Sequence, residues 1–227
     1  MDIEEKIQSC EHNLKQIDHF NPDPYYVNHF LEDFIKSVID VYDGIIEEAN
    51  RDFGFFIPEK CSLESFERKA KEKNDKTALE FSDWFNENYK NEHKPSYPSF
   101  IKKLIIIFLE QDKIPKTVVK ILAKDRYKDD IFQEITVRSE KGKLSHEELE
   151  IEIKRHLPLF LQLLNQKRKR NGEPLVSERK VAASTFLEIE GFETIEIPYS
   201  CGIYLPVLKR IVKDSRYQIR QLSKGMI

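Results

Sequence analysis

The sequence predicts an all-α or mainly α protein, a multi-helix bundle with room for one short hairpin or strand in its C-terminal half. Only 7 of the 227 residues are glycine, too few for a β-sandwich, because that fold needs a turn about every 8 to 12 residues. Apolar residues instead recur at alternating spacings of four and three, which is typical of a helix with one buried face. A hydrophobic fraction of 40% supports a core, so intrinsic disorder is not expected.

The clearest expected helix covers residues 25–50, where apolar side chains recur at helical spacing and a second set widens the stripe. An amphipathic helix over residues 3–18 precedes it, and the Asn-Pro-Asp-Pro run at residues 21–24 separates the two. The positions that define the stripe are Val27, Leu31, Phe34, Val38, Val41 and Ile45. This pattern indicates a core helix that packs on two neighbours of a bundle.

An apolar loop follows at residues 52–61. We expect Phe53, Phe55 and Phe56 of this loop to fill the bundle, because large aromatic side chains are seldom left in water. Ser62 is the expected N-cap of the next helix, which is polar and runs to about residue 73. A further helix is expected over residues 75–91.

The second half begins after a Lys-Pro-Ser-Tyr-Pro-Ser run at residues 94–99, the strongest helix breaker in the chain. Residues 127–144 fit either a helix or one arm of a hairpin, and residues 194–197 fit a short strand. Pro158 is expected to kink the helix that contains it. The expected helices are residues 100–111, 116–124, 145–171, 177–189 and 203–223.

Charge is distributed unevenly between the two halves. Residues 1–113 contain 15 Lys and Arg against 24 Asp and Glu, a formal charge of −9, whereas residues 114–227 contain 22 against 16, a formal charge of +6. We therefore expect an acidic N-terminal helical bundle at residues 1–95 and a basic C-terminal helical region at residues 96–227, or one continuous domain.

Two basic clusters are candidate sites for nucleic acid or for a protein partner. One is the run at residues 167–170, and the other is a line of cations on the last helix, where spacings of three and four place them on one stripe. A line of Lys and Arg can follow a phosphate backbone. Alternatively, the cations offset a helix dipole or pair with the acidic half. The candidates are Lys167, Arg168, Lys169, Arg170, Lys209, Lys213, Arg216, Arg220 and Lys224.

Motifs for common chemistry are absent from the sequence. The six histidines form neither HxxxH nor HExxH, and neither of the common glycine-rich phosphate-binding motifs occurs. The distant spacing of Cys10, Cys61 and Cys201 predicts reduced, buried thiols rather than a zinc or redox site. We therefore expect no cofactor and no metal.

Residues 25–38 read Tyr-Tyr-Val-Asn-His-Phe-Leu-Glu-Asp-Phe-Ile-Lys-Ser-Val, residues 47–50 read Glu-Glu-Ala-Asn, and residues 81–85 read Phe-Ser-Asp-Trp-Phe. Across residues 23–95 the chain resembles the first long helices of prokaryotic HEPN-like helical domains. The resemblance implies a helical bundle able to dimerise. Members of that family active as ribonucleases carry an Arg followed four to six residues later by His, a spacing that is not present here; Lys90 and His93 are the alternative catalytic pair.

The leading hypothesis is a non-enzymatic binding, regulatory or oligomerising protein with a basic face on its C-terminal helix. The alternative is an enzyme, either a degenerate HEPN-type ribonuclease or a metal-dependent hydrolase. The candidate partners are a second copy of the chain, RNA or DNA, and an acidic protein. The longest apolar run, residues 104–109, is far shorter than the roughly 20 residues that span a bilayer, so we expect no membrane partner. The three reduced cysteines predict a cytoplasmic protein.

Overall fold

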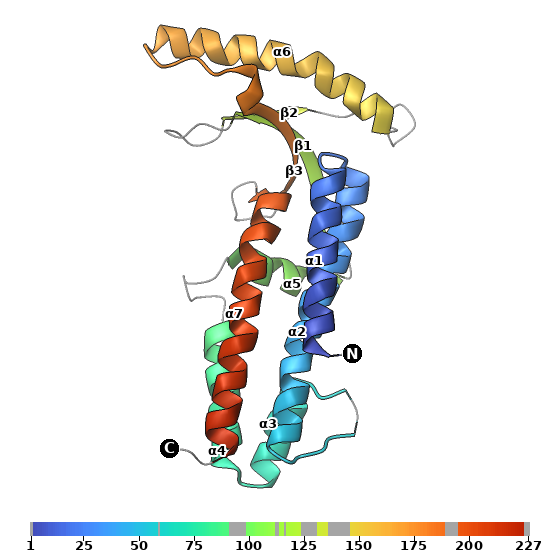
Figure 1. The fold of residues 1–227 in the computed structure, drawn as a ribbon, viewed down its shortest axis with the longest axis vertical. Coiled ribbons are helices and arrows are strands. Elements are labelled where there is room, and N and C mark those ends of the chain that lie inside the picture. Colours follow the sequence, from blue (N-terminus) through green and yellow to red (C-terminus); the bar gives the residue numbers. More distant parts are fainter. Residues whose placement is uncertain are drawn as a thin grey trace. The chain divides into compact units, whose positions relative to one another are not determined.

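The computed structural model describes residues 2–58, 60–90, 99–111, 114–115, 117–123, 131–135, 146–188 and 195–224 (Figure 1). The described part is mainly α, as the sequence predicts, and contains one small antiparallel sheet. Its α-helices are α1 (Ile3–Phe20), α2 (Pro24–Asp52), α3 (Leu63–Glu72), α4 (Lys76–Phe85), α5 (Ser99–Gln111), α6 (His146–Arg170) and α7 (Ile197–Ser223). Its strands are β1 (Thr117–Ala123), β2 (Ile131–Ile135), β3 (Val181–Leu187) and β4 (Ile195–Glu196). A π-helix, η1 (Asn86–Lys90), continues α4, and a 3-10 helix, η2 (Glu178–Lys180), precedes β3.

The chain divides into two compact units that interleave along the sequence. The first unit contains Met1–Lys15, Leu31–Ile114 and Tyr199–Ile227, and the second contains Gln16–Phe30 and Pro115–Pro198. This division differs from the expected boundary between residues 95 and 96, because both units take residues from both sides of it. The helices α1 and α2 each contribute residues to both units.

The core of the first unit forms where α1, α2 and α7 run side by side (Figure 1). The stripe expected on residues 25–50 is fully inaccessible to solvent throughout. Its members in this unit are Leu31, Phe34, Val38, Val41 and Ile45, and Val27 belongs to the second unit. Within this unit, the hydroxyl groups of Tyr42 on α2 and Tyr204 on α7 share a hydrogen bond of 2.5 Å. Tyr204 is fully buried. Its contact with Tyr42 therefore holds α7 against α2 at this point.

The loop before α3 agrees with the sequence only in part. Phe55 is buried and Phe53 is half-buried, and both rings contact Phe66 of α3. Phe56, which was expected to fill the bundle, is instead 73% exposed. Its backbone has a φ of 50°, so the chain turns in the left-handed region and the side chain leaves the cluster. Ser62 caps α3 as expected, accepting a hydrogen bond from the amide of Ser65.

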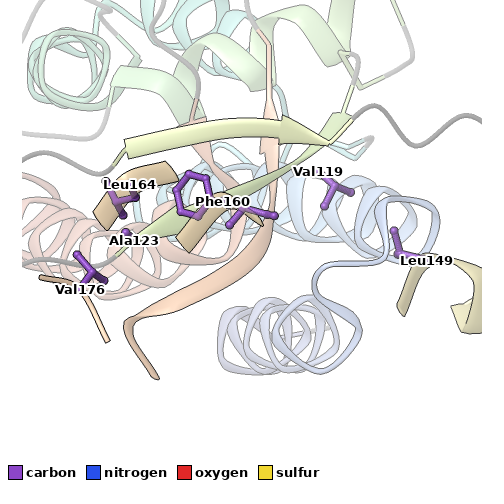
Figure 2. Packing of buried hydrophobic residues seen from close by; sticks show 7 residues of the cluster. Val119, Ala123, Leu149, Phe160, Leu164 and Val176 are labelled. Carbon is purple, nitrogen blue, oxygen red and sulfur yellow. The ribbon is translucent and has the colours of Figure 1, made fainter. Parts of the chain in front are cut away.

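The second unit contains the sheet, in the order β2-β1-β3-β4 with every neighbouring pair antiparallel. Successive side chains of β1 point to opposite faces of the sheet, so they belong to two different hydrophobic clusters. Val119, Ile121 and Ala123 belong to the cluster that α6 covers, and Figure 2 shows side chains of this cluster. Val118 and Leu122 belong to a separate cluster with Phe186 of β3. The residues that complete the α6 cluster are Leu149, Phe160, Leu164 and Val176.

Two segments that were expected to be helices are strands. Residues 116–124 contain β1, and residues 177–189 contain η2 and β3. In β1, every residue from Val118 to Ala123 is buried, so neither a period of two nor a helical period is visible in its sequence. The described part of residues 127–144 is β2, which resolves the helix-or-hairpin alternative in favour of a strand. The short strand expected at residues 194–197 is confirmed as β4.

The long helix expected from residue 145 is confirmed as α6, with Pro158 inside it. Gly172 follows its end with a φ of 67°, a left-handed conformation that glycine adopts without steric cost. The amides of Gly172 and Glu173 donate to the carbonyl groups of Lys169 and Arg168. These hydrogen bonds give partners to two carbonyl groups in the last turn of α6. The helix ends near residue 171, as the sequence predicts.

Candidate nucleic-acid interface

The candidate interface lies on α7, whose two faces differ sharply in burial. The inner face carries a fully buried Tyr204 and a run of buried aliphatic side chains. These residues recur at spacings of three and four, so they orient α7 within the first unit. The buried aliphatic residues of α7 beyond Tyr204 are Leu205, Leu208, Ile211, Val212, Ile219 and Leu222. The opposite face carries the predicted line of cations, of which some are exposed and others contact carboxylates of the same unit.

Arg216, one of the five predicted cations on α7, is engaged by two carboxylates of the first unit. Its Nε donates to Glu48 of α2 at 2.8 Å, and its terminal nitrogens donate to both Glu48 and Glu4 of α1. The hydrogen bonds to Glu48 and Glu4 raise the pKa of the Arg216 guanidinium above its ordinary value. They also lower the pKa of Glu4 from 4.5 to about 2. Arg216 is therefore a link among three helices rather than an exposed cation.

Lys209 has a similar role near the middle of α7, about two turns before Arg216. Its Nζ lies 2.5 Å from Oε1 of Glu11 on α1. This hydrogen bond lowers the pKa of Glu11 below its ordinary value. The alternative that the acidic and basic parts of the chain pair with each other thus holds for Lys209 and Arg216.

The other three predicted cations of α7, Lys213, Arg220 and Lys224, are exposed. None of them pairs with a carboxylate in the part of the chain that the structure describes. At about 1.5 Å of rise per residue, the line from Lys213 to Lys224 is roughly 16 Å long. It can therefore reach two or three successive phosphates of an extended single strand.

Tyr217 lies among these cations and was not singled out from the sequence. It follows Lys213 by four residues and precedes Arg220 by three, so the three side chains share one face of α7. The residue is 61% exposed. An aromatic residue at helical spacing normally belongs to the core. The sequence signal that identifies Tyr217 as an exception is its position opposite the buried stripe, in line with cations.

The second predicted cluster, at the end of α6, also separates into exposed and engaged residues. Lys167, Lys169 and Arg170 are exposed. Arg168 is buried, and its guanidinium donates to the carbonyl of Pro174 at 3.0 Å. Arg168 therefore stabilises the turn after α6, as does Asn165, which exchanges hydrogen bonds with the backbone of Val176.

Of the alternative catalytic pair, Lys90 and His93, the structure describes only the backbone of Lys90. Lys90 is the last residue of η1, and His93 lies outside the described residues. Within the described ranges, no group of three or more His, Cys, Asp or Glu side chains is arranged to hold a metal ion. Burial raises the pKa of the Cys10 thiol to about 12, so this cysteine is not a thiolate nucleophile at neutral pH.

The chain matches no protein-family model, no curated protein and no solved structure. Among the described residues, no helix combines the length and the apolar character needed to cross a membrane.

Proposed function

We propose that this protein is a non-enzymatic, cytoplasmic binding module that holds single-stranded nucleic acid on the exposed face of α7. The observation that carries the proposal is Tyr217, a residue that is 61% exposed and lies between Lys213 and Arg220 on the face of α7. Single-strand binding combines cations that follow the backbone with aromatic rings on which bases stack. The face of α7 offers both groups within three turns of one helix.

The carboxylates near α7 favour one path for the strand. Glu11, Glu4 and Glu48 engage Lys209 and Arg216, so the edge of α7 that faces α1 and α2 carries negative as well as positive charge. A phosphate backbone is repelled by this edge and attracted by Lys213, Arg220 and Lys224. We therefore place the strand along these three cations, with one base stacked on Tyr217.

The same ion pairs hold the binding face in place before the ligand arrives. Arg216 joins α7 to both α1 and α2, and Tyr204 anchors the helix to α2. Less ordering is then required when nucleic acid binds, which favours affinity. The enzymatic alternative has no comparable support among the described residues, and the HEPN-like resemblance stays a prediction.

The test is fluorescence anisotropy with a labelled single-stranded RNA, a single-stranded DNA of the same sequence and the matching duplex, each across a salt series. Changing Lys213, Arg220 and Lys224 to Gln should weaken binding and make the plot of log K against log salt shallower by about 2, since each lost contact with a single strand contributes about 0.7. Tyr217→Ala should cost about 1–3 kcal/mol of binding free energy without changing this slope.

The matched control changes Arg68, Lys71 and Lys76 to Gln. These residues are also two lysines and one arginine, all exposed, and they lie on α3 and α4 of the same unit. The control should bind as the unchanged protein does. Absence of binding at low salt, or equal weakening by the control, would overturn the proposal. Cleavage of the RNA that disappears in His93→Ala would show that the protein is an enzyme.

A further inference from the structure

The helix α6 has a second apolar face that no described residue covers. Its inner face packs on β1 through Leu149, Phe160 and Leu164. On the outer face, Ile151 is 63%, Leu159 50% and Leu163 51% exposed. With about 100° of rotation per residue, these three side chains fall within an arc of roughly 120°. They form one stripe, about 18 Å long, which we call the outer stripe.

The ends of the outer stripe carry opposite charges. The first turn of α6 contains Glu147 and Glu148, and the last turn contains Lys167, Lys169 and Arg170, all exposed. The exposed cations at this end have no ion-pair partner in the described ranges. A partner that covers the stripe with matching charges must therefore be basic where α6 begins and acidic where it ends.

A second copy of α6 running in the opposite direction meets this requirement. In an antiparallel pair, the acidic end of each helix lies beside the basic end of the other, and the two helix dipoles are also aligned favourably. A parallel pair would place like charges side by side, which is unfavourable. Because an antiparallel pair of identical helices has a two-fold axis, each copy uses the same patch and the assembly closes as a dimer.

We propose that the chain forms a two-fold dimer through the outer stripe of α6, with Leu159 on the axis. In this register, Leu159 contacts its own copy, and Glu148 lies opposite Arg170 of the second copy. Arg155 lies opposite Leu163, so its aliphatic stem covers that leucine while its charged end stays in water. This surface is on a different helix and in a different unit from the proposed nucleic-acid face. A test that contradicts one of the two proposals therefore leaves the other unaffected.

The first test is analytical ultracentrifugation of the full chain over a wide range of concentration. The unchanged protein should show a monomer–dimer equilibrium, and Leu159→Arg should shift it to monomer because two like charges then meet on the axis. The control Tyr199→Arg changes another exposed apolar residue, 64% exposed and outside α6, and should leave the dimer intact. A monomer at every concentration, or a dimer that Leu159→Arg does not weaken, overturns the proposal.

The second test establishes the direction of the helices. Under mild oxidation Leu159→Cys should form a disulfide-linked dimer, because residues on the axis lie within bonding distance. Ile151→Cys should not, since two copies of residue 151 lie about 24 Å apart in an antiparallel pair. The native cysteines are buried and should not cross-link. Cross-linking through both positions would indicate a parallel pair and overturn the antiparallel arrangement.

Discussion

The side-chain oxygen of Asn21 accepts two hydrogen bonds from Thr185, one from the backbone amide at 2.9 Å and one from the hydroxyl at 2.8 Å. The hydroxyl of Ser184 donates to the same oxygen at 3.3 Å. Thr185 is fully buried and Ser184 is almost so. One side chain between α1 and α2 therefore satisfies three donors of β3 within the second unit.

The change Asn21→Ala should lower the free energy of unfolding by about 1–3 kcal/mol, because it leaves buried donors of Thr185 and Ser184 without their acceptor. Chemical denaturation checks this expectation. Asn171→Ala is the control, since the side chain of Asn171 makes its one described bond at an exposed site, and its effect should stay within about 0.5 kcal/mol. Equal effects of the two changes would show that the Asn21 bonds contribute little.

Two glycines in helix interiors should respond in opposite ways to alanine. A Cβ at Gly44 in α2 would lie 2.8 Å from Cγ1 of Ile3 and 3.2 Å from Nζ of Lys6, so Gly44→Ala should destabilise the protein by about 1–3 kcal/mol. A Cβ at Gly202 in α7 would meet nothing within 4 Å. Gly202→Ala should therefore stabilise by about 0.5–1 kcal/mol. Thermal unfolding of both variants tests the close approach of α1 to α2.

Acid should weaken the link between α1 and α7. The Arg216 guanidinium lowers the pKa of Glu4 from 4.5 to about 2, so the charged form is favoured in the folded state. The resulting stabilisation is fully present above pH 4.5 and is lost as the pH falls toward 2. Because this ion pair is partly exposed, we expect less than about 1 kcal/mol.

The measurement is the free energy of unfolding against pH for the unchanged protein and for Glu4→Gln. The difference between them should shrink as the pH falls from 4.5 toward 2. Glu80→Gln, at an exposed carboxylate of α4, is the control and should leave the pH profile unchanged. A difference for Glu4→Gln that is constant across this range would contradict the ion-pair explanation.

The thiols should react only when the chain unfolds. Burial raises the pKa of Cys10 to about 12 and raises that of Cys61 above its ordinary value, and Cys201 is fully buried. We expect very slow reaction of the native protein with a thiol reagent at pH 8 and rapid reaction of three thiols in denaturant. A thiol that reacts rapidly in the native protein would contradict this burial.

The sequence was a better guide to the helices than to the sheet. The spacing on α2 predicted its buried face because the opposite face is polar, whereas β1 is buried on both faces from Val118 to Ala123, Lys120 included, and therefore shows no period of exposed residues. The sequence also placed the cations of α7 on one stripe. It could not show that Glu4, Glu48 and Glu11 engage Arg216 and Lys209, because these carboxylates lie nearly 170 to 212 residues away.

The interleaving of the two units has a consequence for the order of folding. Glu4 and Arg216 are 212 residues apart in sequence, so their contact closes a very long loop, and the entropy lost in closing a loop grows with its length. The docking of α7 onto α1 should therefore follow the transition state. Changes at Arg216 should then speed unfolding and leave the refolding rate nearly unchanged, which makes this ion pair a determinant of how long the native protein survives.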